Sequence, residues 1–276
     1  MTEQQCPDGV EFIYSPFKPW FSFDYGAPAD CWTGAICTLT PADEARKQQF
    51  AATALVMGLL PLVLRDIAWP ERRIVLVPAP LPALAEVIVR ALGLEPRITS
   101  DPGDWKKDDV ERWMSWIQSS WLATFALRSG LVAIILSTLA LVVSFGALAL
   151  IEVYSKRSAL GCVYPIFGLT WCVLGVLPAA VHVIFVVRRR GKEKELGGSG
   201  GRASAVQGAD EAWPVQFAWA VYYIAGTLVY TSIMAITPLE LFVWVVVMFA
   251  VTGASKLLAL YICLVLRNPL VDSRLD

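Results

Sequence analysis

Long runs without charge are the feature of this chain that most limits how it can fold. Residues 130–151 contain no ionisable side chain, and the runs 161–187, 214–236 and 240–266 are almost as apolar. A helix needs about 20 apolar residues to cross the hydrocarbon core of a bilayer. Charged residues make up only 17% of the chain, against about 25% in soluble domains. We therefore predict an all-α, polytopic helical membrane bundle with four firm transmembrane helices.

Two weaker segments precede these runs. Residues 50–64 are short for a span and contain Pro61, and residues 74–94 contain three prolines together with Glu86 and Arg90. Proline in a helix interior removes a hydrogen bond and kinks the helix. The two segments therefore form a bent or re-entrant hairpin, lie at the membrane interface, or span the membrane.

Basic residues in the loops predict the orientation. The loop 188–213 opens with RRRGKEKE, whereas the loop 152–160 carries only two basic residues. The positive-inside rule then places 188–213 and the C-terminal tail in the cytoplasm. We expect the membrane to be the plasma membrane or the endoplasmic reticulum. Three arginines in 65–73 oppose this orientation if both weak segments span. The basic cluster is either a topology signal alone or also a site for anionic lipid headgroups. The candidate residues for binding headgroups are Arg188, Arg189 and Arg190.

The remaining segments are polar, flexible or rich in aromatic residues. The N-terminal arm, 1–49, is strongly aromatic from residue 12 to residue 25 and either docks on the bundle, enters the interface or binds a partner. Residues 95–129 are polar and include a predicted amphipathic Trp-rich helix that lies in the headgroup region or packs on the bundle. Gly and Ser predict a flexible linker over 196–210, and a short tail follows at 267–276.

The sequence contains few motifs that indicate a catalytic or binding site. The sequence has no P-loop, GxGxxG, HExxH or GxSxG motif and a single histidine. Its six cysteines are scattered without a CxxC pair, which argues against a zinc site. Cys31 and Cys37 can form a disulfide only if their segment lies in an oxidising compartment. The net charge of −1 gives no sign of nucleic-acid binding, and we expect no metal and no cofactor.

Three ionisable side chains lie inside apolar segments: Glu86, His182 and Lys256. A charge within a bilayer costs about 2.5–3.5 kcal/mol and is by default a functional candidate. Counted from the nearest cytoplasmic helix end, all three lie in the same half of the membrane, so they can form one polar cluster. The alternatives are that Lys256 extends to the headgroups or forms a structural ion pair, and that His182 is a hydrogen-bonded packing residue.

Lys256 shares a helix face with Thr252, one turn earlier. We therefore expect Lys256 to face the bundle interior, where its ammonium needs acceptors, with Glu86 as the first partner. Glu240 lies at a helix entrance, where we expect it to be solvated.

Aromatic residues are frequent in the last two runs. Tyr222, Tyr223 and Tyr230 lie deeper than an interfacial belt, and a buried tyrosine hydroxyl needs a partner. These residues either line a pocket for a lipophilic small molecule or pack between helices.

One stretch near the N-terminus carries a family resemblance. The stretch CWTGAICTLTPADEARKQQFAATALVMGLLPLVL, residues 31–64, joins a Cys-containing aromatic segment, a short EARK stretch and an Ala/Leu-rich segment with GLLP. It resembles the opening region of multi-span membrane proteins of filamentous fungi. The resemblance implies a fungal membrane protein and carries no catalytic or binding residues.

Three functions fit these features. The first is a non-enzymatic helical bundle, transporter-like or scaffold, surrounded by lipid. The second is a membrane-embedded enzyme of cyclase or isomerase type that uses Glu86 as an acid on a lipophilic substrate. The third is an adaptor that recruits partners through the cytoplasmic loop and the N-terminal arm.

Overall fold

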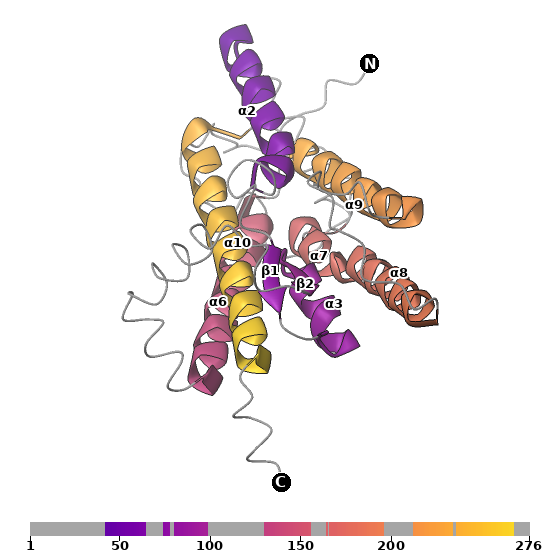
Figure 1. The fold of residues 1–276 in the computed structure, drawn as a ribbon. Coiled ribbons are helices and arrows are strands. Elements are labelled where there is room, and N and C mark those ends of the chain that lie inside the picture. The colour runs from indigo at the N-terminus through magenta and orange to yellow at the C-terminus, as the bar shows by residue number, and fades with distance from the viewer. Residues whose placement is uncertain are drawn as a thin grey trace, which may run out of the picture. The chain divides into compact units, whose positions relative to one another are not determined.

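The structure is a computed structural model that describes residues 42–64, 74–77, 80–98, 130–155, 164, 166–195, 212–233 and 236–267. The expected N-terminal arm up to residue 41, the Trp-rich helix and the 196–210 linker lie outside these ranges, as do Cys31 and Cys37. The described part is mostly helical, and Figure 1 labels its elements. They are α2 (Glu44–Leu62), β1 (Ile74–Val77), α3 (Ala83–Ala91), β2 (Glu95–Ile98), α6 (Gly130–Ser155), α7 (Phe167–Leu174), α8 (Val176–Glu195), α9 (Trp213–Thr231) and α10 (Pro238–Arg267).

Three stretches are helical, long and apolar enough to cross a membrane: Gly130–Glu152, Phe167–Gly191 and Pro238–Leu266. They match three of the four expected spans. The fourth, 214–236, is not confirmed. It forms the 19-residue helix α9, in which Gln216 and three tyrosines lower the mean hydropathy.

The segment 74–94 does not form the membrane-length helix that its hydropathy allowed. It forms β1 and α3, and β1 pairs in parallel with β2, with Ile74 opposite Glu95 and Val77 opposite Ile98. Parallel strands need a crossover between them, and here α3 lies in that crossover. With nine residues, α3 is far too short to span a bilayer.

Backbone chemistry fixes the end of α3. Gly93 has a φ of 93°, in the left-handed region that glycine adopts without a Cβ penalty. The Gly93 amide donates to the Arg90 carbonyl and the Leu94 amide donates to the Val89 carbonyl. These bonds satisfy the last carbonyls of the helix and turn the chain into β2.

Helix α2 begins earlier than the expected segment 50–64. Asp43 accepts a hydrogen bond of 2.8 Å from the Arg46 amide, which is the bond of an N-cap. Pro61 lies in the last turn of the helix, so it does not interrupt the helix interior.

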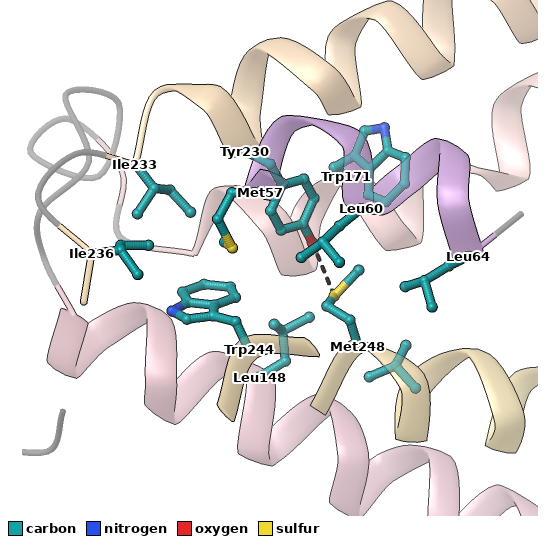
Figure 2. Close-up of a cluster of buried hydrophobic side chains, with 11 residues drawn as sticks. Met57, Leu60, Leu64, Leu148, Trp171, Tyr230, Ile233, Ile236, Trp244 and Met248 are labelled. Atoms are coloured by element: carbon teal, nitrogen blue, oxygen red, sulfur yellow. Dashed lines mark hydrogen bonds between the residues drawn. The ribbon is translucent and has the colours of Figure 1, made fainter. Parts of the chain in front are cut away.

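The described helices and strands form two compact units, each with its own core. One unit joins α2 with residues 143–174 and 220–251, and the other includes 69–142, 175–219 and 252–276. The core of the first unit is drawn in Figure 2 and includes Met57, Leu148, Tyr230, Trp244 and Met248. The core of the second unit consists of these buried residues: Val77, Leu81, Val89, Leu94, Ala259, Leu260 and Cys263.

Candidate functional site

Helix α3 carries a buried ion pair. Glu86 and Arg90 are four residues apart, so they lie on one face of the helix. They are only 1% and 5% exposed. Arg90 Nη2 lies 3.0 Å from Glu86 Oε1, and Arg90 Nε lies 3.3 Å from the same oxygen. This face of α3 packs against α8.

Helix α8 supplies a second arginine to the same carboxylate. Arg190 Nη1 lies 3.0 Å from Glu86 Oε2, and Arg190 Nη2 lies 3.4 Å from Glu86 Oε1. The guanidinium therefore spans both oxygens, an arrangement that gives strong and directional carboxylate binding. Arg190 itself is 27% exposed, so it forms the outer edge of the pair.

His182 joins this group through Arg90. Arg90 Nη1 lies 2.9 Å from His182 Nε2, and the Trp219 indole nitrogen lies 3.4 Å from His182 Nδ1. Arginine and tryptophan side chains can only donate. A neutral imidazole has a single acceptor nitrogen, so His182 accepts from only one of these two donors, and Arg90 makes the shorter contact. We call Glu86, Arg90, His182, Arg190 and Trp219 the Glu86 cluster.

The Glu86 cluster is a hydrogen-bonded network in a poorly hydrated place. Glu86, Arg90 and His182 are all buried, and each engages another member. Such networks stabilise one arrangement when every member is satisfied, and they are costly when one member is removed. The geometry of the Glu86 cluster suits holding α3 and α8 together, since Arg190 of α8 pairs with Glu86 of α3.

Two of the three predicted polar residues thus meet. Glu86 and His182 both contact Arg90, which the hydropathy pattern presents only as an interruption of the 74–94 segment. The arginines that pair with Glu86 are Arg90 and Arg190, and the sequence predicted neither of them as its partner. Lys256 lies in the same unit, with its ammonium nitrogen buried, and its Cε is 3.8 Å from the position that a Cβ would take at Gly93.

The buried acid Glu152 was not predicted from the sequence. Glu152 accepts hydrogen bonds from the backbone amides of Gly168, at 2.6 Å, and Leu169, at 3.1 Å. These amides open α7, and the first amides of a helix have no partner inside it. Glu152 directly follows the apolar run 130–151, so the sequence places it in the loop 152–160, whereas α6 continues to Ser155.

The three tyrosines take part in packing. Tyr222 stacks on Trp171 with ring centroids 4.7 Å apart, and Tyr223 meets Tyr222 edge to face. Tyr230 is fully buried, and its hydroxyl contacts the Met248 sulfur at 3.2 Å, the dashed line in Figure 2. These contacts fit the packing alternative, and the pocket for a lipophilic molecule stays a prediction.

Glu240 was expected to be solvated, and that expectation is wrong. It is buried and its carboxylate accepts from the Thr237 amide at 2.9 Å, while the Glu240 amide donates to the Thr237 hydroxyl at 3.3 Å. This reciprocal pair is a capping box. The motif was present in the sequence as Thr237-Pro-Leu-Glu240, with the proline at the first helical position where it is favoured.

The other candidates give no further site. Arg188 and Arg189 are exposed on α8. The free cysteines of the described residues, Cys172 and Cys263, lie in different units. No group of three or more His, Cys, Asp or Glu side chains that could hold a metal ion is found within the described ranges.

No protein-family model, curated protein or solved structure matches this chain. Its own helices support an integral membrane protein, because three of them are long and apolar enough to span a bilayer. A more specific role has to follow from the Glu86 cluster and the other buried polar groups.

Proposed function

We propose that the protein is a non-enzymatic membrane scaffold, in which the membrane helices hold the β1–α3–β2 element against α8, between His182 and Arg190. The observation that carries this proposal is the pairing of one buried carboxylate, Glu86, with arginines from two segments, Arg90 of α3 and Arg190 of α8. In the predicted orientation the Arg190 end of this contact lies toward the cytoplasm, so the element would be held on that side.

The energetics of the buried ion pair favour a role in holding α3 against α8, which we call the fastening role. Removing one partner from a buried ion pair costs several kcal/mol because the remaining charge stays buried. Undocking α3 from α8 would uncover Glu86 and Arg90 and separate both from Arg190. The network therefore resists separation of the two helices, which is what a scaffold requires of the joint between its membrane part and its aqueous part.

The enzymatic alternative fits this geometry poorly. It used Glu86 as an acid, yet one oxygen of Glu86 receives Arg90 and Arg190 and the other receives Arg190. An acid must reach the group that it protonates, and both oxygens of Glu86 are turned toward arginines. The adaptor alternative rests on the arm and the loop, most of which lies outside the described residues.

A transporter-like bundle is the second candidate, and Glu152 favours it. A buried carboxylate at the end of a candidate span is costly and often belongs to an ion or proton pathway. The candidate span Phe167–Gly191 is also divided at Gly175 between α7 and α8, and interrupted helices are typical of transporter binding sites.

Hydrogen exchange in detergent tests the scaffold. We expect Arg190→Gln to speed exchange of the α3 amides while leaving those of α6 unchanged, because α3 loses a contact to α8. Arg188→Gln, on the same helix but exposed, is the matched control and should leave α3 protected. Equal exchange of α3 in wild type and Arg190→Gln would contradict the fastening role.

Flux measurements separate the two candidates. Liposomes that contain the purified protein and the pH dye pyranine should show no proton flux above protein-free liposomes if the protein is a scaffold. A flux that Glu152→Gln abolishes would establish the transporter-like alternative instead.

A further inference from the structure

Helix α3 has its polar and apolar faces in the reverse of the usual order. Glu86 and Arg90 are the only polar side chains among its nine residues, and both are buried. Leu84 and Ile88, by contrast, are 74% and 39% exposed. A helix on the surface of a water-soluble domain normally buries its apolar stripe and exposes its polar side chains. The solvent around α3 therefore has to be one that favours aliphatic groups over charges.

The helix period separates the two faces of α3. Each residue is turned by about 100° from the one before it, so Glu86 and Arg90 lie within roughly 40° of each other. Leu84 and Ile88 form a second pair with the same spacing, about 160° away on the opposite side. The charged side packs against α8, and the aliphatic side is left outside this contact.

The stretch of α8 that receives α3 belongs to a candidate membrane span. Arg90 contacts His182 and Glu86 contacts Arg190, and both of these α8 residues lie within Phe167–Gly191. The two contacts are eight positions apart on α8, or about 12 Å along the helix axis. Amphipathic helices at a bilayer surface insert by about 5–10 Å. A bilayer crossed by this span would therefore reach α3 at the level of the headgroups and the first part of the acyl chains.

An apolar solvent explains why the charges of α3 face inward. The hydrocarbon of a bilayer holds no water that could solvate an exposed charge, so Glu86 and Arg90 need partners within the protein, and Glu86 pairs with both Arg90 and Arg190. On the same stretch of α8, Ile184 and Val187 are 49% and 48% exposed. Both helices thus present aliphatic side chains outward at this level.

We infer that Leu84 and Ile88 form a lipid-contacting surface of α3, covered by acyl chains of the leaflet at the Arg190 end of α8. Lipid is the occupant because this surface continues the exposed aliphatic side of a candidate span, which a bilayer solvates. The inference is independent of the scaffold proposal. The outward surface lies opposite the Glu86 cluster, so what covers it is a separate question from what holds α3 against α8.

Spin labels on the full chain in phosphatidylcholine liposomes test this surface. A nitroxide is attached through p-acetylphenylalanine, which leaves the native cysteines in place, at position 84 or 88. Its collisions with oxygen, which concentrates among acyl chains, are compared with those of a water-soluble nickel chelate. Leu139, 56% exposed on the candidate span of α6, is the lipid reference, and Glu44, with a side chain 80% exposed, is the water reference. We expect oxygen to dominate at both α3 positions, as at Leu139.

Two outcomes of the labelling would overturn the inference. Collisions dominated by the nickel chelate at positions 84 and 88, as at Glu44, would show that α3 faces water. Few collisions with either reagent would show that protein, such as a second copy of this chain, covers the surface.

Amide exchange in the same liposomes gives a second measurement. Leu84→Gln should speed exchange of the α3 amides several-fold, because it turns a polar side chain toward acyl chains. Leu84→Met keeps the position apolar and is the matched control, which should exchange as wild type does. Equal exchange in the two variants would contradict the lipid-contacting surface, whatever Arg190→Gln shows for the scaffold.

Discussion

Glu86 and Arg190, 104 residues apart in the sequence, form a two-point ion pair in which Nη1 meets Oε2 at 3.0 Å and Nη2 meets Oε1 at 3.4 Å. The carboxylate is 1% exposed and the guanidinium 27%. The two partners therefore differ in what their removal leaves behind. Loss of Glu86 leaves Arg90 buried without its carboxylate, whereas loss of Arg190 leaves Glu86 still paired with Arg90.

We predict that Glu86→Gln lowers the free energy of unfolding by about 3–5 kcal/mol, and Arg190→Gln by about 1–2 kcal/mol. The double variant should be less destabilised than the sum of the two, because the pair is lost only once. Chemical denaturation in detergent measures all three. Glu44→Gln is the control: it breaks the exposed Glu44–Lys47 pair on α2 and should change the free energy of unfolding little. A Glu86→Gln protein as stable as this control would remove the fastening role.

The arginine pairs of Glu86 also change what we expect of Lys256. Both carboxylate oxygens already receive arginine donors, so Lys256→Met and Glu86→Gln should act independently. Their effects on the free energy of unfolding should add to within about 0.5 kcal/mol. A coupling as large as that between Glu86→Gln and Arg190→Gln would instead identify Lys256 as an electrostatic partner of Glu86, as the sequence predicts.

The Thr237–Glu240 capping box predicts a local effect at the start of α10. Thr237→Ala removes the hydroxyl that accepts from the Glu240 amide and should cost about 1 kcal/mol of unfolding free energy. Thr138→Ala, at an exposed position inside α6, removes a similar hydroxyl without a cap and should be neutral or slightly stabilising. If both variants change the free energy of unfolding by the same amount, the capping box does not stabilise α10.

The sequence predicted long helices better than short elements. Run length alone located α6 and α10, since a continuous apolar stretch has few other folds available. The strands β1 and β2 have four residues each, too few for an alternating pattern to stand out, and their pairing depends on a partner 21 residues away. α9 shows the limit of counting apolar residues, because its aromatic side chains are large and hydrophobic yet carry polar groups.

Part of the candidate site was predictable from the sequence. Glu86 and His182 stood out because ionisable groups are rare in apolar segments. Arg190 did not, because it lies within a basic run whose ordinary explanation is topology. Only its contacts with Glu86 in the structure distinguish it from its two neighbours. Glu152 was missed because a helix end cannot be located to within a few residues from hydropathy.

Gly168 provides the sharpest test of the Glu152 arrangement. A Cβ at Gly168 would meet Glu152 Oε1 and would lie 2.9 Å from the Tyr230 hydroxyl oxygen. The carboxylate cannot retreat without losing its 2.6 Å bond from the Gly168 amide. We therefore predict that Gly168→Ala costs about 1–3 kcal/mol of unfolding free energy through overpacking, in spite of the better helix propensity of alanine.

Gly146 is the matched control for this substitution. It lies inside α6, and a Cβ there would meet no atom within 4 Å. Gly146→Ala should stabilise the protein by about 0.5–1 kcal/mol, because alanine loses less backbone entropy than glycine in a helix. The opposite signs of the two variants, measured in the same denaturant titration, separate a steric cost at Gly168 from a general effect of alanine.

The part of the steric cost that comes from Glu152 should disappear when the Glu152 side chain is shortened, while the 2.9 Å contact with the Tyr230 hydroxyl oxygen remains. In a Glu152→Ala background the carboxylate that the new Cβ meets is absent, so Gly168→Ala should cost less there than in wild type. Glu152→Ala is itself destabilising, because two helix-opening amides lose their acceptor. A Gly168→Ala cost that is equal in both backgrounds would mean that Glu152 does not occupy the space beside Gly168, and the Glu152 site would have to be abandoned.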